Sequence, residues 1–218
     1  MASGGTTSGS WTRSTLLRAG RASIRVWLRH VPAADPLLLT EARRDFDRLS
    51  GQVPWPGQPV LRLHLAFSVL PGAAIYRAMR ERGRDADTAA DAVTRALVTM
   101  AAPRHRVLQR LTRRERGRRV FMAAAQRSLR AFPPPGWQAT WVERTPHRVA
   151  FDMTRCFDLD MLRLVGAEAI APAYCAVDDV LYVDLCPELC WARTGTLATG
   201  ALRCDFRFEH HPSMAARL

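Results

Sequence analysis

The sequence predicts an α+β fold in which a helical N-terminal two-thirds packs on a small antiparallel sheet formed by the C-terminal third. Apolar residues recur at helical spacing as far as Leu129, whereas the segments 147–156, 189–194 and 202–208 alternate between apolar and polar residues as strands do. The run PPPG at 133–136 separates the two regions, because proline cannot continue a helix. A chain of 218 residues can bury a core without disulfides or a structural metal.

Residues 1–59 are predicted to form a section of their own, made of a small polar tail, two helices and a proline-rich linker. Apolar residues between 11 and 31 share one helical face, and the other positions hold five arginines and no acid. Such a basic amphipathic helix suits a membrane surface or a transit peptide, although packing on the protein or on a partner is favoured. A second helix is expected over 36–49, before the linker GQVPWPGQP at 51–59.

Residues 60–218 are predicted to form a single α+β domain. Its first segment, 60–70, is ambiguous, because its apolar residues alternate like a strand but are also numerous enough for a buried helix that continues past Pro71. Gly83 would end that helix. No stretch of about 18 residues is both apolar and uncharged, which argues against a membrane-spanning helix.

Two more helices are expected before the sheet. Asp85 can cap a helix whose apolar face includes Val93 and Leu97. Pro103 can start the other, which runs to Leu129 with a break near Gly117 and carries the densest basic cluster of the chain, RRERGRR at 113–119.

The C-terminal third mixes short helices with the predicted strands. A helix over 157–165 would stop at Gly166, and residues 168–184 are expected to be mostly helical. The strands 189–194 and 202–208 are joined by a connection that contains two glycines.

The formal charge of +12 is unevenly distributed. All 32 basic residues are arginine, and the chain has no lysine or asparagine, a bias typical of a GC-rich genome. The first 150 residues carry +16 and the remaining residues carry −4. A basic region of this kind suits nucleic acid or an anionic membrane, but solvated helix faces are the simpler interpretation.

The five cysteines all lie in the C-terminal third, at positions 156, 175, 186, 190 and 204. An odd number without a secretory signal predicts reduced thiols in the cytoplasm. Only Cys186 and Cys190 have a close spacing, whereas a structural zinc site usually has two close pairs, so neither a metal nor a cofactor is expected. Phosphate-binding loops, dinucleotide fingerprints and zinc-protease motifs are absent from the sequence.

Candidate reactive groups lie at the margins of the predicted sheet and on the helix before it. Strand alternation puts Arg155, Arg193 and Cys204 at the edge of the apolar face, where a guanidinium must pair with an internal acid or with the carboxylate of a ligand. Cys175 shares a helical face with Asp178 and Asp179. This acid–thiol arrangement is either a reactive pair or a buried structural cysteine beside a paired acid.

The order of these groups resembles the L-2-amino-thiazoline-4-carboxylic acid hydrolase family. The resemblance rests on Arg155-Cys156, then Cys175-x-x-Asp178, then RTGTLATGA at 193–201 and CDFRF at 204–208. It covers roughly residues 60–209, and the last two motifs are its most specific part. Cys186 and Cys190 lie outside the pattern.

The resemblance implies a hydrolase of specialised or biosynthetic metabolism that opens a 2-amino-thiazoline ring with water to give N-carbamoyl-cysteine. The nucleophile would be the thiolate of Cys175 or Cys204, or a water activated by an aspartate, and Cys175 with Asp178 is the preferred pair. Arg193 or Arg155 would hold the substrate carboxylate. Further residues expected at the substrate site are Cys156, Thr196 and Asp205, although Asp205 is also placed to hold the neighbouring strand or the Thr196 loop.

Two other functions remain open at this point. A non-catalytic accessory protein could keep the same fold and bind a small ligand, or a partner through its N-terminal basic helix, which could also support a homo-oligomer. A nucleic-acid binder could use RRERGRR, but this cluster lacks interleaved aromatic residues, so no nucleic-acid partner is expected. The expected partner is therefore a small-molecule carboxylate substrate.

Overall fold

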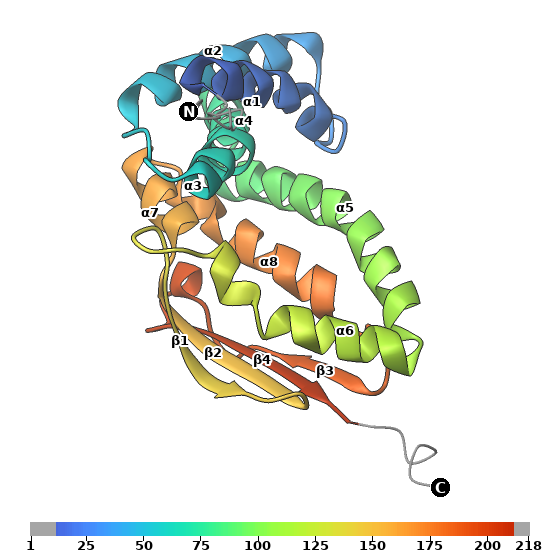
Figure 1. The fold of residues 1–218 in the computed structure, drawn as a ribbon. Coiled ribbons are helices and arrows are strands. Elements are labelled where there is room, and N and C mark those ends of the chain that lie inside the picture. Colours follow the sequence, from blue (N-terminus) through green and yellow to red (C-terminus); the bar gives the residue numbers. More distant parts are fainter. Residues whose placement is uncertain (1–11, 212–218) are drawn as a thin grey trace, which may run out of the picture.

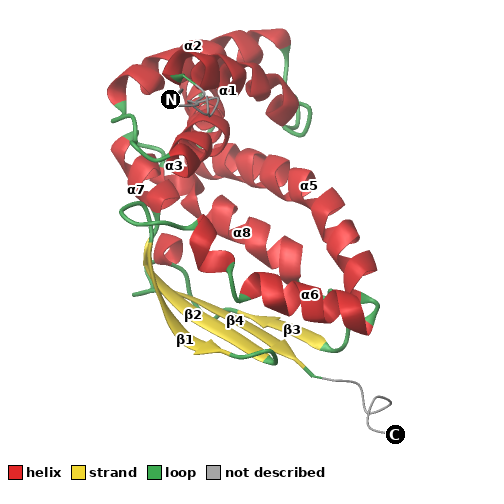
Figure 2. Ribbon diagram, in the orientation of Figure 1, coloured by secondary structure: helices red, strands yellow, loops and turns green. Residues whose placement is uncertain are grey.

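A computed structural model describes residues 12–211 and shows an α+β fold, as the sequence predicts. Helices fill the N-terminal part, and a four-stranded antiparallel sheet lies at the C-terminal end, with helices packed on one of its faces (Figures 1 and 2). The helices are α1 (Arg13–Leu28), α2 (Pro36–Gln52), α3 (Pro59–His64), α4 (Leu70–Glu81), α5 (Ala86–Thr112), α6 (Glu115–Ala125), α7 (Phe157–Leu164) and α8 (Ala171–Tyr182).

The sheet has the order β1-β2-β4-β3, and all neighbours are antiparallel. Its strands are β1 (Gln138–Arg144), β2 (Arg148–Arg155), β3 (Leu189–Ala192) and β4 (Cys204–His210). The sequence predicts β2, β3 and β4 but not β1. This edge strand buries no residue fully, and its alternation rests on three half-buried side chains, Ala139, Trp141 and Glu143.

The ambiguous segment after residue 59 is helical. A π-helical turn over Leu65–Val69 joins α3 to α4 without a break, and Pro71 lies in the first turn of α4. By length and composition the continuous helix Pro59–Glu81 could cross a membrane, which the sequence prediction did not anticipate. Most of its apolar window is buried inside the protein, as expected of a core helix.

The boundaries of α5 and α6 correct the predicted helices. Pro103 lies inside α5 and does not start a helix. The helix α5 ends at Thr112 instead, and α6 begins at Glu115. Gly117 is close to the carbonyl of Leu111, so only a residue without a side chain fits where α6 folds back on the end of α5.

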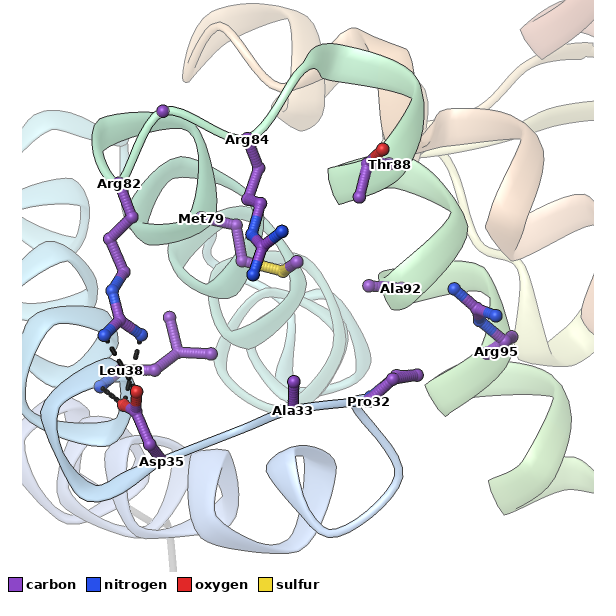
Figure 3. A pocket seen from close by; sticks show the side chains of 11 residues that line it. Pro32, Ala33, Asp35, Leu38, Met79, Arg82, Arg84, Thr88, Ala92 and Arg95 are labelled. Carbon is purple, nitrogen blue, oxygen red and sulfur yellow. Dashed lines mark hydrogen bonds and ion pairs between the residues drawn. The ribbon is translucent and has the colours of Figure 1, made fainter.

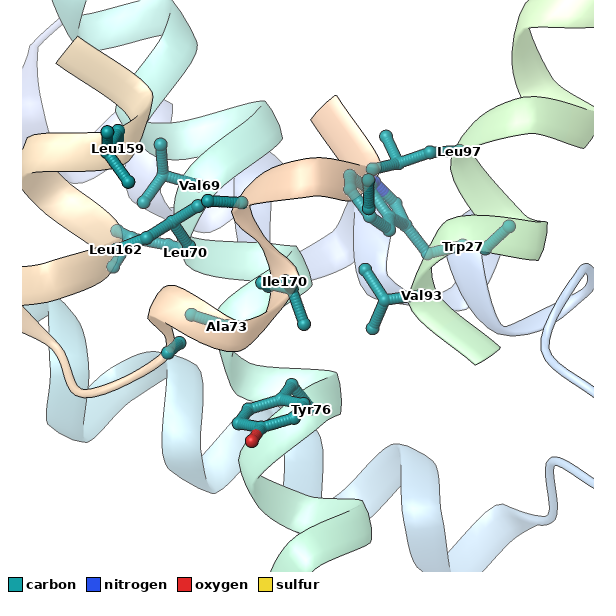
Figure 4. Packing of buried hydrophobic residues seen from close by; sticks show 14 of the residues in the cluster. Trp27, Val69, Leu70, Ala73, Tyr76, Val93, Leu97, Leu159, Leu162 and Ile170 are labelled. Carbon is teal, nitrogen blue, oxygen red and sulfur yellow. The ribbon is translucent and has the colours of Figure 1, made fainter. Parts of the chain in front are cut away.

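One apolar core joins the N-terminal helices to the rest of the protein. Gly20 of α1 lies against the backbone of Ala66 and the ring of Phe46, which lets α1 approach the π-helical turn closely. Trp27 of α1 lies beside Val93 and Leu97 of α5 (Figure 4), and its ring approaches Gly72 of α4. Residues on both sides of the predicted boundary at residue 59 therefore share one core. The predicted tail at 1–10 and the first residue of the predicted helix, Trp11, lie outside the described residues.

Candidate functional site

A cavity of about 400 Å³ lies between α8, α7, the middle of α5 and the inner face of the sheet. Its lining side chains come from the helices α3, α5, α7 and α8, the strands β2 and β4, and the turns and loops between them. Among the predicted site residues, its lining includes Cys156, Cys175, Asp178, Arg193 and Cys204. The structure thus brings these five residues together around one space.

Arg193 follows β3 and is the most buried charged group of the cavity, with a side chain that is 4% exposed. Its guanidinium lies 3.3 Å from the carboxylate of Asp178 and 2.7 Å from that of Asp179. It also donates to the carbonyl oxygen of Cys175 at 2.9 Å. Since two acids neutralise it, Arg193 holds α8 against the sheet edge and has little charge left for a ligand.

Asp178 is the acid of the cavity whose protonation is most perturbed. Burial raises its pKa to about 7, and the neighbouring acids Asp179 and Asp158 add to this effect, while Arg193 opposes it. An acid with a pKa near neutrality can give or take a proton at physiological pH.

Cys175 and Cys204 form a pair of interacting thiols. The Cys204 thiol donates to the Cys175 sulfur, and this bond, together with one from Thr196 and the charge of Arg193, lowers the pKa of Cys175. The same interaction raises the pKa of Cys204, whose sulfur also accepts from the backbone N–H of Leu197 at 3.2 Å. Cys175 is therefore the thiol that ionises first.

Cys156, Asp158 and His64 also line the cavity. Burial raises the pKa of Cys156 to about 12, so this thiol stays protonated. His64 lies 3.5 Å from the carboxylate of Asp158. Burial opposes a charge on His64, but the nearby carboxylate of Asp158 outweighs it and raises the His64 pKa.

Asp205 and Thr196 are not part of the cavity lining but hold the loop beside it. The Asp205 carboxylate accepts from the backbone N–H groups of Thr194 and Gly195, both at 2.9 Å, and from the Thr194 hydroxyl at 2.7 Å. Thr196 caps the 3-10 turn Leu197–Thr199 and reaches Cys175. Asp205 does not line the cavity; it fixes the loop that carries Thr196, the second of the two roles open to it from sequence.

Arg155 lies apart from the cavity, contrary to its predicted place on the apolar face. It is the last residue of β2, its side chain is 46% exposed, and it pairs with Asp160 at 2.7 Å. The strand alternation is lost at its end, where Thr154 and Arg155 are both exposed. Arg155 is therefore not available to a ligand in this cavity.

The sequence analysis missed several groups that line the cavity. His64 and Asp158 come from α3 and α7, and Tyr174 donates to the carbonyl of Ser68 at 3.0 Å. Arg104 of α5 also lines the cavity, and its side chain forms no ion pair or hydrogen bond with any residue in 12–211. Helical spacing at Tyr174 was a usable signal, but no local motif links His64 or Arg104 to the cysteines.

Three other candidate sites within residues 12–211 have no comparable set of thiols and acids around a cavity. Within residues 12–211, no group of three or more His, Cys, Asp or Glu side chains is placed to hold a metal ion. A cavity of about 500 Å³ between the α1–α2 connection, α4 and α5 is lined by no cysteine or histidine; there Arg82 pairs with Asp35 at 2.8 Å (Figure 3). In RRERGRR, Arg118 is buried and pairs with Glu115 at 2.9 Å, so part of that cluster has a structural role.

Comparisons with known proteins agree with the motif pattern. A family model described as L-2-amino-thiazoline-4-carboxylic acid hydrolase matches residues 62–208, which is more than half of the chain. The matched range includes every cavity residue named above and excludes α1 and α2. Searches of curated proteins and of solved structures gave no match.

Proposed function

The chain belongs to the L-2-amino-thiazoline-4-carboxylic acid hydrolase family, and from this membership we propose that it hydrolyses a small cyclic amidine or thiazoline-type carboxylic acid. The observation that carries the proposal is the proximity of Cys175, Asp178 and Cys204 in one cavity. The chemistry needs a nucleophile, a group that exchanges protons, and a cation for the carboxylate.

Cys175 is the nucleophile in this proposal. A thiolate is the reactive form of cysteine, and the hydrogen bond from Cys204 favours a thiolate at Cys175. Attack at the amidine carbon forms a C–S bond to Cys175, and the bond between that carbon and the ring sulfur then breaks. Cys204 remains protonated, because the same interaction raises its pKa, and it acts as the donor to Cys175.

Asp178 is the proton-exchanging group. In its protonated form it gives a proton to the amidine nitrogen or to the departing ring sulfur. As a carboxylate it then takes a proton from the water that attacks the S-bound intermediate. The water oxygen becomes the carbonyl oxygen of the carbamoyl group, Cys175 leaves as a thiolate, and the two water protons end on the product sulfur and nitrogen.

Arg104 is the proposed anchor of the substrate carboxylate. The two arginines that the sequence suggests for this role are both occupied, since Arg193 is neutralised by two acids and Arg155 pairs outside the cavity. Arg104 lines the same cavity and has an uncommitted guanidinium within the described residues. Its planar fork suits a carboxylate.

The test is turnover of 2-amino-thiazoline-4-carboxylate and related cyclic amidine acids by the purified full chain. We expect N-carbamoyl products by mass spectrometry, and an adduct on Cys175 when the reaction is stopped early. Because the thiols must be reduced, we propose a cytoplasmic location for this activity. No turnover of any cyclic amidine acid, together with tight binding of one, would favour the alternative, a ligand-binding accessory protein.

A further inference from the structure

An outer groove of about 380 Å³ opens beside the cavity that holds the cysteines. The groove and the cavity share part of their lining, namely His64, Ser68, Leu97, Arg104 and Val177. Because five residues line both spaces, the groove and the cavity adjoin each other, and Arg104 lies at their border.

The outer groove differs from the inner cavity in its chemistry. Beyond the shared residues, its wall consists of Trp27, Leu63, Phe67, Met100 and Ala101, with no acid, thiol or hydroxyl among them. Leu63 is 46% exposed although it borders this wall. An apolar surface of this kind gains free energy when a ligand covers it.

The combined volume of the groove and the cavity is larger than a five-membered ring with one carboxylate would fill. The inner cavity of about 400 Å³ is already within the range of pockets that hold drug-sized ligands, and the groove adds a comparable space. Resting on the function proposed above, we propose that the groove binds an aliphatic or aromatic substituent of the substrate, so that the preferred substrate is an apolar-substituted cyclic amidine acid.

The position of Arg104 supports a substrate as the occupant of the groove. With its carboxylate at Arg104, a ligand would have its reactive ring on the inner side, near Cys175, and any apolar substituent on the outer side. Trp27 comes from α1, so this part of the groove wall lies outside the residues that the family model matches. A substrate carboxylate would pair with Arg104, which lines both spaces, whereas an apolar protein segment in the groove would leave this guanidinium unpaired.

The experiment compares two products of the proposed hydrolysis, N-carbamoyl-cysteine and N-carbamoyl-α-benzyl-cysteine, by calorimetric titration of the full chain. In the second compound the benzyl group is attached to the carbon that carries the carboxylate, and therefore lies on the outer side. We expect the benzyl compound to bind about tenfold more tightly to the natural protein, since its ring is buried in the groove. Leu63→Asp should reduce this preference to about threefold or less. Val107→Asp is the matched control, because Val107 is similarly exposed, at 52%, but lines neither space, and it should keep the full preference.

Each outcome decides the proposal. Equal binding of the two acids to the natural protein would overturn it, and so would a preference that Leu63→Asp leaves unchanged. In both cases turnover of the unsubstituted ring would leave the hydrolase function intact. Failure of both acids to bind, together with no turnover of a cyclic amidine, would reject the proposed function, and this inference with it.

Discussion

The guanidinium of Arg193 lies 3.3 Å from the carboxylate of Asp178, yet the pKa of Asp178 is raised. Burial outweighs the attraction, and Asp179 and Asp158 add repulsion, so the pKa reaches about 7. Arg193 in turn is shared between two acids. The pair therefore supplies a group that exchanges protons near neutrality and is held in place by a cation.

Replacing Asp178 should change the pH dependence of the proposed reaction. If its protonated form is the acid, kcat/KM should fall as the pH rises above about 7. Asp178→Asn should lower kcat by about 10²–10⁴-fold and remove this alkaline limb. Asp179→Asn takes away one repelling charge and should move the limb to lower pH. A limb that is unchanged in Asp178→Asn would contradict the assignment.

Cys175 should be the most reactive of the five thiols. Its lowered pKa predicts the fastest alkylation by iodoacetamide at pH 7, measured by peptide mass spectrometry, and protection by a bound substrate analogue. Cys175→Ser should reduce turnover by at least about 10³-fold. Cys190→Ser is the control, because Cys190 is exposed and lies outside the cavity. Full activity of Cys175→Ser would rule out the covalent route.

Arg104 should recognise the negative charge of the ligand's carboxylate. Loss of a charge-assisted hydrogen bond typically costs about 1.5–3 kcal/mol, so Arg104→Gln should raise KM for the acid about 10–100-fold. The carboxamide analogue, which lacks the charge, should bind equally to both proteins. Arg106→Gln, an exposed change two residues further along α5, should have no effect on either ligand. A similar loss for acid and carboxamide would show that Arg104 does not recognise the charge.

Asp205 should stabilise the fold above acidic pH. Burial alone would raise its pKa, but the hydrogen bonds from Thr194 and Gly195 prevail and lower it. Because the folded pKa lies below the unfolded value of about 3.8, this stability is present above that value and is lost as the pH falls through the folded pKa. Asp205→Ala should lower the free energy of unfolding at pH 7 by about 2–4 kcal/mol in urea titrations. An effect that is equally large at pH 2 would contradict this origin.

Gly20 should tolerate no side chain. A methyl group at this position would meet the backbone of Ala66, which cannot move without disturbing the π-helical turn. Gly20→Ala should therefore lower the free energy of unfolding by about 1–3 kcal/mol, despite the better helix propensity of alanine. Gly51→Ala, also in a helix but with open space around it, is the control and should be neutral or slightly stabilising. The opposite order in thermal denaturation would contradict the close packing of α1.

The sequence predicts the elements that have strong internal patterns. The alternation of Val149, Phe151 and Met153 specifies β2, and Asp85 caps α5 as expected. Pro103 misled the prediction because a proline near the middle of a long amphipathic pattern resembles a helix start. The strand β1 has no buried residue and so leaves only a weak pattern.

The candidate site was predictable only where its residues follow a local pattern. Helical spacing puts Cys175 beside Asp178, and strand alternation singles out Arg193 and Cys204. His64 and Arg104 reach the same cavity through tertiary packing, which no local spacing reports. The sequence also leaves open how Arg193 is paired, because both an internal acid and a ligand satisfy the rule that a buried guanidinium needs a partner.

The contribution of Trp27 to the groove bears on how relatives of this protein will differ. Proteins that share the pattern over 62–208 can have the same cavity with Cys175 and Asp178, while a different leading helix would reshape the wall of the groove beside it. Among such relatives, the part of the gene that encodes the matched range would determine the reaction, and the part that encodes the leading helix would determine the substrate preference. A function assigned to a relative from its similarity over 62–208 would then predict the type of bond that is cut more reliably than it predicts the substrate.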